Sequence, residues 1–193
     1  MRIILASASP RRREILARAG IRFEVIPSEA DETVTDGMAP EEVVRVLSRR
    51  KNDEVYGRLH DDGAFILSAD TIVSCRGEIL GKPADEADAY RMISLLSGSR
   101  HEVLTGYTMR YGGKVFTGCE VTEVLFKELT EEQKRSYVMS GEPMDKAGGY
   151  AIQEHGDAFV ERYIGDYDNV VGLPLAAILS AARAYFGVDP VEE

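Results

Sequence analysis

Hydrophobic residues along the chain form two kinds of pattern, short continuous runs and longer stretches with helical spacing. The short β-branched or apolar runs predict strands over residues 2–5, 23–26, 64–74, 78–80, 103–111, 115–126 and 159–164. Helical spacing and helix-start signals predict helices over residues 10–19, 40–59, 85–96, 130–139 and 174–186. Residues 142–156 combine glycines, prolines and acids in quick succession and predict a loop.

Strands and helices alternate along the chain, which is the pattern of an α/β fold. Turn signals at Arg76-Gly77 and Gly112-Gly113 predict hairpins, so the sheet cannot be purely parallel. We therefore expect a mixed, twisted sheet flanked by helices, arranged as two lobes with a central cleft. A length of 193 residues suits one compact domain, and we expect it to span residues 1–193.

Composition and charge exclude several classes of function. The chain is 44% hydrophobic, which supports a real core, and its 23 Lys+Arg against 33 Asp+Glu give a net charge of −10. Such a surface repels polyanions, so we expect no nucleic acid partner. The two cysteines, Cys75 and Cys119, belong to no C-x-x-C pair, which argues against a zinc ribbon.

The N-terminal segment and the apolar runs bear on localisation. No run approaches the ~20 apolar residues that a membrane helix needs. Near the N-terminus the positive charges follow the apolar stretch, whereas in a signal peptide they precede it. We expect a soluble cytoplasmic protein without membrane contact.

Asp70 and Lys51 contradict their surroundings. Asp70 lies within the apolar run 65–73, where a buried carboxylate must be protonated, paired with a cation or open to a cleft. The plain alternative is a helix cap or a single ion pair with an arginine. Lys51 falls on the apolar stripe of the helix predicted over residues 40–59. Its ammonium group either reaches water or points at an anion inside the protein.

Residues 7–13 read Ser-Ala-Ser-Pro-Arg-Arg-Arg and connect the first predicted strand to the first predicted helix. Backbone N–H groups and the positive end of the helix dipole converge at such a corner, which suits an anion. Three arginines in a first helical turn oppose that dipole, so we expect a ligand that offsets them. A solvated basic turn is the alternative.

Two further segments suit a ligand, although plain surface loops would explain both. Pro83 keeps Lys82 in an extended conformation, so the lysine side chain projects from the segment that follows a hairpin. Residues 144–153 are rich in small side chains, and Gln153 offers both a donor and an acceptor to a base edge. The histidines show no metal-ligand or triad spacing, and we expect surface or loop positions for His60, His101 and His155.

The exceptional residues are two carboxylates and four cations, namely Glu32, Asp70, Arg11, Arg12, Lys51 and Lys82. Carboxylates hold Mg²⁺ or Mn²⁺ and activate water, while cations neutralise phosphate oxygens and the leaving group. An acidic protein with a basic cleft fits a small polyphosphate better than a nucleic acid. These residues therefore predict metal-dependent phosphate chemistry.

Short motifs spread over essentially the whole chain carry a family resemblance. They are Ser7-Ala8-Ser9-Pro10-Arg11-Arg12, Asp31-Glu32, Lys51, Ala69-Asp70-Thr71, Gly81-Lys82-Pro83, Asp145-Lys146-Ala147-Gly148, Ile152-Gln153 and Gly172-Leu173-Pro174. In this order they resemble the Maf family of nucleoside triphosphate pyrophosphatases. Asp70-Thr71 and Ile152-Gln153 resemble the branch that acts on dTTP and UTP. The chain departs from the family at Ser68, where glycine is common, and at Gly149, where alanine is usual.

The resemblance implies hydrolysis between the α and β phosphates of a nucleoside triphosphate, in housecleaning of the nucleotide pool. It implies that Asp70 accepts the proton of the attacking water and, with Glu32, binds Mg²⁺ or Mn²⁺. The polyphosphate would be held by Ser7, Arg12, Lys51 and Lys82. Base selection would fall to Arg11, Thr71 and Gln153. The family fold is an ITPase-like α/β sandwich with a cleft between two lobes, usually in homodimers.

Two other interpretations stay open. One is the same chemistry on a modified nucleotide such as 7-methyl-GTP, although that branch typically carries Gln after the aspartate. The other is a nucleotide-sensing regulator of cell division, which would bind nucleotides without hydrolysing them. The set of carboxylates and lysines favours the enzyme.

Overall fold

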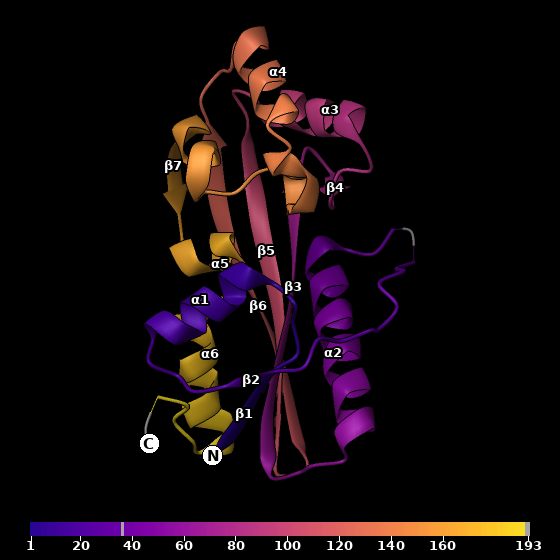
Figure 1. The fold of residues 1–193 in the computed structure, drawn as a ribbon, viewed down its shortest axis with the longest axis vertical. Helices are drawn as coiled ribbons and strands as arrows, with labels where there is room; N and C mark the ends of the chain where they lie inside the picture. The colour runs from indigo at the N-terminus through magenta and orange to yellow at the C-terminus, as the bar shows by residue number, and fades with distance from the viewer. Residues whose placement is uncertain (36, 192–193) are drawn as a thin grey trace. The chain divides into compact units, whose positions relative to one another are not determined.

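The computed structural model of the protein describes residues 1–35 and 37–191, and Figure 1 shows its ribbon. Over these residues seven strands form one sheet: β1 Arg2–Leu5, β2 Glu24–Val25, β3 Ala64–Cys75, β4 Glu78–Leu80, β5 Arg100–Tyr111, β6 Lys114–Phe126 and β7 Val160–Ile164. Their order is β2-β1-β3-β5-β6-β7, with β4 paired to β3. Strand β1 is parallel to β2 and β3, whereas β4 is antiparallel to β3, and β7 to β6. The mixed α/β sheet expected from the sequence is confirmed.

In the described part of the chain six α-helices accompany the sheet: α1 Pro10–Arg18, α2 Pro40–Leu59, α3 Glu86–Leu96, α4 Glu131–Met139, α5 Tyr167–Val171 and α6 Leu175–Ala181. Local capping explains where they begin. The Ser9 hydroxyl accepts a hydrogen bond from the Arg12 N–H ahead of α1, and Thr130 with Gln133 forms the expected capping box at α4. Among the described residues no helix has both the length and the apolar character needed to span a membrane.

Two stretches differ from the expectation. Residues 142–156 are not one irregular loop, because 3₁₀ turns form at Glu142–Asp145, Ala147–Gly149 and Glu154–Phe159. Such turns need only three or four residues and leave no periodic hydrophobic pattern to detect. Helix α5 is likewise too short to show a periodic hydrophobic pattern. The predicted C-terminal helix begins at Leu175 and changes to a π-helical turn at Ala182–Phe186.

The chain folds into two compact units, in agreement with the expected two lobes. The first comprises residues 1–70, 105–120 and the described residues from Gly172 onward, and the second comprises residues 71–104 and 121–171. Strands β3, β5 and β6 contribute residues to both units. Within β3 the division falls between Asp70 and Thr71, so these two site candidates belong to different units.

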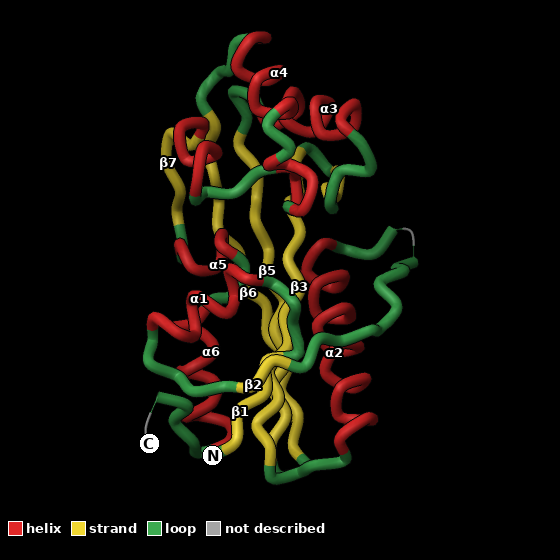
Figure 2. The backbone as a smooth tube through the Cα atoms, in the orientation of Figure 1, coloured by secondary structure: helices red, strands yellow, loops and turns green. Residues whose placement is uncertain are grey.

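In the first unit, helix α2 packs directly on the strands. Figure 2 shows α2 along one side of them, with α1 and α6 on the other. The apolar residues Ile4, Val55 and Ile66 belong to one buried cluster that joins helix and sheet. Gly106 on β5 permits this approach, because a Cβ atom there would lie 2.2 Å from the carbonyl oxygen of Val44 on α2. Any side chain at Gly106 would therefore push the helix off the strand.

The core of the second unit contains a cluster of aromatic rings. Phe126 and Tyr150 meet edge to face with ring centroids 4.6 Å apart, and Tyr137 meets Phe159 at 4.9 Å. Edge-to-face contact stabilises such a pair in addition to the stabilisation that comes from its buried apolar area. Helices α3 and α4 pack against each other in the same unit.

His101 lies in this aromatic cluster, so the expectation of a surface or loop position was wrong for it. The side chain is 2% exposed, its ring lies 5.0 Å from that of Phe126, and its Nε2 is 2.7 Å from the Tyr150 hydroxyl. Alternation along β5 explains the burial, because His101 shares the inward face of the strand with Val103. His60 and His155 are exposed, as expected.

Burial of His101 predicts acid lability. Desolvation lowers its pKa from 6.5 to about 4, so the neutral ring stabilises the fold fully above pH 6.5, and this contribution is lost as the pH falls toward 4. The loss amounts to about 3 kcal/mol. Urea unfolding of the wild type and of His101→Gln at pH 7, 5.5 and 4 measures it. We expect the variant to lose less stability than the wild type over this range, and equal losses would contradict the assignment.

Candidate active site

A lysine in the first unit contacts two carboxylates. The Lys51 Nζ on α2 lies 2.5 Å from Oδ1 of Asp70 on β3 and 2.8 Å from Oε1 of Glu32. Asp70 is 8% exposed, and the Lys51 side chain is 13% exposed. Of the alternatives left open by the sequence, the lysine therefore points at anions rather than into water. Asp70 is therefore paired with a cation, as one of the alternatives required.

The local sequence explains why these groups meet. Pro40 and Glu42 fix the start of α2, and its apolar face then brings Lys51 to the surface that packs on the strands. All six residues of β3 before Asp70 are buried, so this part of the strand is held inside the unit. Asp70 does not lie at a strand end, because β3 continues to Cys75. A helix packed closely on a buried strand thus places the ammonium on the carboxylate.

Arg12, in the first turn of α1, forms a hydrogen bond with a residue far along the chain. Its Nε donates to the carbonyl oxygen of Gly172 at 2.8 Å, and its Nη1 donates to the Ser7 hydroxyl at 3.0 Å. Burial lowers the pKa of the guanidinium, and the negative charges of Asp70 and Glu32 oppose that shift. Arg12 stays charged, because the guanidinium does not lose its proton in proteins. Its positive charge is therefore held close to the two carboxylates.

The corner before α1 lies beside the strand that carries Asp70. Strands β1 and β3 are parallel and pair Leu5 with Leu67, and the Ala6 N–H donates to the Leu67 carbonyl at 2.7 Å. Continuing this register brings Ser7, which is buried, level with the residue before Asp70. The first unit thus contains Ser7, Arg12 and the three residues Lys51, Asp70 and Glu32, which we call the Lys51 cluster. Together they can bind an anion and move a proton.

The arginines of the first turn have protein partners as well. Arg13 donates to the Ala8 carbonyl at 2.9 Å, and Arg12 makes the contacts described above. These contacts offset part of the charge that the sequence predicted a ligand would offset. Arg11 is half-buried at the start of α1.

The second unit contains the remaining candidates. Lys82 is exposed, and the segment that carries it is fixed because the Gly148 N–H donates to the Gly81 carbonyl at 2.9 Å. Gly148 has φ +67°, and a Cβ atom there would lie 2.7 Å from a methyl group of Val73, so glycine is needed for both reasons. Thr71 on β3 is half-buried, and so is Gln153, which lies between the second and third 3₁₀ turns.

The carboxylates of the first unit suit a divalent cation. Asp70 and Glu32 both direct an oxygen at the same ammonium group, so a small cation could bind the same two oxygens. Among the described residues no group of three or more acidic, histidine or cysteine side chains gathers as a metal site. Mg²⁺ is commonly bound by one or two carboxylates and completed by substrate phosphates and water. The two carboxylates therefore fit a metal that arrives with a phosphorylated ligand.

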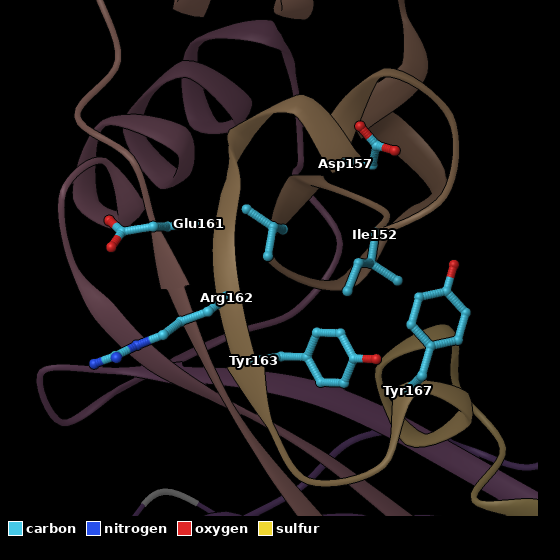
Figure 3. Close-up of a pocket in the computed structure, with 7 residues that line it drawn as sticks. Ile152, Asp157, Glu161, Arg162, Tyr163 and Tyr167 are labelled. Atoms are coloured by element: carbon cyan, nitrogen blue, oxygen red, sulfur yellow. The ribbon is translucent and has the colours of Figure 1, made fainter.

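A hollow of about 430 Å³ lies on the surface of the second unit, beside β7. In Figure 3, Ile152, Tyr163 and Tyr167 point toward one another, whereas Glu161 and Arg162 point away from them. None of the expected site residues lines this hollow. Its two carboxylates against one arginine make it a poor site for a polyphosphate.

Two buried polar residues beside the Lys51 cluster had no place in the site predicted from the sequence. Asn52 follows Lys51 on α2, Ser68 precedes Asp70 by two residues on β3, and both have 0% exposure. Asn52 and Ser68 could have been recognised as Lys51 and Asp70 were, because each is a polar residue in an apolar part of its predicted helix or strand.

Comparisons with known proteins cover nearly the whole chain. A family model described as "Maf-like protein" matches residues 2–185. A protein of Thermococcus gammatolerans named dTTP/UTP pyrophosphatase is 51% identical over 186 residues, which are 96% of this chain and 98% of that protein. Proteins with the same name from Geotalea uraniireducens and Bacillus cereus are 48% and 46% identical, each over 97% of this chain and, respectively, 96% and 97% of their own length. Among solved structures, a HAM1 protein from Coxiella burnetii matches with a TM-score of 0.49 and 13% identity, over 94% of this chain and 100% of that one.

Proposed function

Because the chain belongs to the Maf family, we propose that it hydrolyses nucleoside triphosphates, with dTTP and UTP as its main substrates. The products are the nucleoside monophosphate and pyrophosphate. Identities of 46–51% to relatives named dTTP/UTP pyrophosphatase support the substrate. The observation that carries the chemistry is the contact of Lys51 with Asp70 and Glu32, near the half-buried charge of Arg12.

In the proposed mechanism Asp70 acts as the general base. Its carboxylate takes a proton from water while the water oxygen bonds to the α-phosphorus. The bond from that phosphorus to the bridging oxygen breaks, and pyrophosphate leaves with the oxygen. Lys51 orients the carboxylate and, with Arg12 and Lys82, neutralises charge on the phosphates. Ser7 adds a hydroxyl donor to the same anion.

A divalent cation, Mg²⁺ or Mn²⁺, is proposed as the cofactor. Asp70 and Glu32 would hold it, and when bound it would neutralise phosphate charge and polarise the phosphoryl group. The Lys51 ammonium balances the charge of the two carboxylates when no metal is bound.

The residues proposed to select the base are Arg11, Thr71 and Gln153. Uracil and thymine present a carbonyl beside an N–H on the edge that a glutamine amide can match. The whole chain, residues 1–193, is proposed to act as one Maf domain, in the cytoplasm and as a homodimer. Its role is then to remove nucleotides from the pool.

Pyrophosphate release from a panel of nucleotides tests this function. We expect dTTP and UTP to be turned over with Mg²⁺ or Mn²⁺ and turnover to stop with EDTA, because the phosphates would lose their counterion. The panel includes the other common triphosphates and 7-methyl-GTP. A clear preference for 7-methyl-GTP would refute the roles given to Thr71 and Gln153. Binding of dTTP without any release of pyrophosphate would favour the nucleotide-sensing regulator.

A further inference from the structure

Asn52 attaches α2 to two strands of the first unit. The side chain has 0% exposure, and its Nδ2 donates to the carbonyl oxygens of Ile66 on β3 at 3.0 Å and Thr108 on β5 at 3.2 Å. Its Oδ1 accepts a hydrogen bond from Arg110 Nε at 3.1 Å. Every polar atom of the amide therefore has a partner, and the two carbonyl acceptors fix which end is the nitrogen.

Ser68 also bonds β3 to α2, but here the strand residue is the donor and the helix is the acceptor. Its hydroxyl lies 2.7 Å from the carbonyl oxygen of Ser48 on α2 and 3.3 Å from that of Thr108. The Ser48 hydroxyl in turn lies 3.1 Å from that of Thr108. The helix is thus bonded to β3 in both directions, since Asn52 donates from helix to strand and Ser68 from strand to helix.

In the sequence, these two contact residues lie between Lys51 and Asp70, each close to one member of the pair. Asn52 is the next residue after Lys51, and Ser68 lies two residues before Asp70 on the same face of β3. The backbone of α2 also touches the sheet at Gly106, where no side chain separates them. A shift of the helix along β3 would therefore break both contacts.

We propose that Asn52 and Ser68 are positioning residues of the active site, which hold α2 against β3 so that the Lys51 ammonium stays on Asp70. This proposal rests on the proposed function, because it concerns the base of that reaction. Ser68 contributes one hydroxyl, whereas the Asn52 amide is bonded through both its nitrogen and its oxygen. Asn52 is accordingly the stronger of the two.

The opposing explanation is that both residues only satisfy buried polar groups. The long stem of Lys51 could then follow a displaced helix, and its ammonium would remain on Asp70. The two explanations predict different results for kcat and for the accessibility of the Lys51 amine.

Asn52→Ala and Ser68→Ala test the proposal, with Asn169→Ala as a matched control. Asn169 is also fully buried, and its Nδ2 donates to the Val103 carbonyl at 3.0 Å and to the Thr122 hydroxyl at 2.9 Å, which ties α5 to strands in the second unit. The measurements are kcat and KM for dTTP, Tm, and acetylation of Lys51 by an N-hydroxysuccinimide ester. The exposed Lys114 serves as the internal reference for acetylation.

For Asn52→Ala we expect kcat to fall about 10- to 100-fold, because a misplacement of about 1 Å is enough for such a loss. For Ser68→Ala, which removes a single tie, the expected fall in kcat is about two- to tenfold. KM should change little in both, and Lys51 acetylation should rise relative to Lys114. Asn169→Ala should lower Tm while kcat and Lys51 acetylation stay at wild-type values.

Wild-type kcat and unchanged Lys51 acetylation in both variants, with a lowered Tm, would overturn the proposal. If Asn52→Ala does not fold, Ser68→Ala decides the question by the same readouts. If the wild type releases no pyrophosphate from any nucleotide, the proposed function has failed. Acetylation of Lys51 then still decides whether the two residues position it, since that readout needs no turnover.

Discussion

The Asp70→Asn variant is expected to lose about 10²- to 10⁴-fold in kcat, which is the usual contribution of a positioned general base. The amide keeps the shape of the carboxylate and removes its charge and basicity. Nucleotide binding should therefore be retained, with a Kd for dTTP close to that of the wild type. Single-turnover pyrophosphate release measures the chemistry, and calorimetric titration with dTTP measures the binding.

Asp61→Asn is the matched control for this substitution. Asp61 also belongs to the first unit and forms an ion pair with Arg2 at 3.0 Å. Loss of that exposed pair should cost little stability and leave kcat unchanged. Turnover of dTTP near the wild-type rate in Asp70→Asn would show that Asp70 is not the base. A cell-division phenotype that persists in Asp70→Asn would favour a regulatory role beside catalysis.

Replacement of Lys51 by methionine is expected to lower kcat/KM about 10²- to 10³-fold, as loss of one electrostatic donor does in other active sites. Methionine keeps the apolar stem and its packing on the strands, so the change isolates the ammonium charge. Asp70 and Glu32 then face each other without the cation that contacts both. Steady-state kinetics with dTTP over a range of Mg²⁺ concentrations measures the loss.

Lys114→Met provides the control for Lys51→Met, because this lysine is exposed at the start of β6 in the same unit. Its replacement should leave kcat/KM within about twofold, since exposed charges are largely screened. A Lys51→Met enzyme with unchanged kcat/KM would remove Lys51 from the site. A loss that appears only in Tm would reduce its role to stabilising the carboxylate pair.

Helix starts and hairpins could be predicted from the sequence because the interactions that define them span only a few residues. The Thr130–Gln133 capping box and the turn at Arg76-Gly77 were recognised in this way, and both occur in the structure. The 3₁₀ turns between residues 142 and 159 and the short helix α5 were missed. They are too short for periodicity, and packing rather than local preference decides them.

In the candidate site too, local sequence patterns identified individual residues but could not show which residues contact one another. The sequence marked Lys51 and Asp70 as polar residues in apolar surroundings, which was enough to suspect each of them. It could not show that Lys51 would contact both Asp70 and Glu32. Nor could it show that Arg12 would turn back to the Gly172 carbonyl, 160 residues further along the chain. His101 was misjudged because the burial of a histidine depends on which face of β5 meets the aromatic core.

The α/β class, most element boundaries, the family and the inventory of charged residues could be predicted before folding is considered, because local patterns and ordered motifs carry that information. Which charges share one environment depends on the folded chain. Such contacts depend on how α2 is seated on β3, through bonds such as that of Asn52 to Ile66, and no spacing along the chain encodes them. The free energy of a buried ion pair depends on distance and desolvation, and both exist only once the chain has folded.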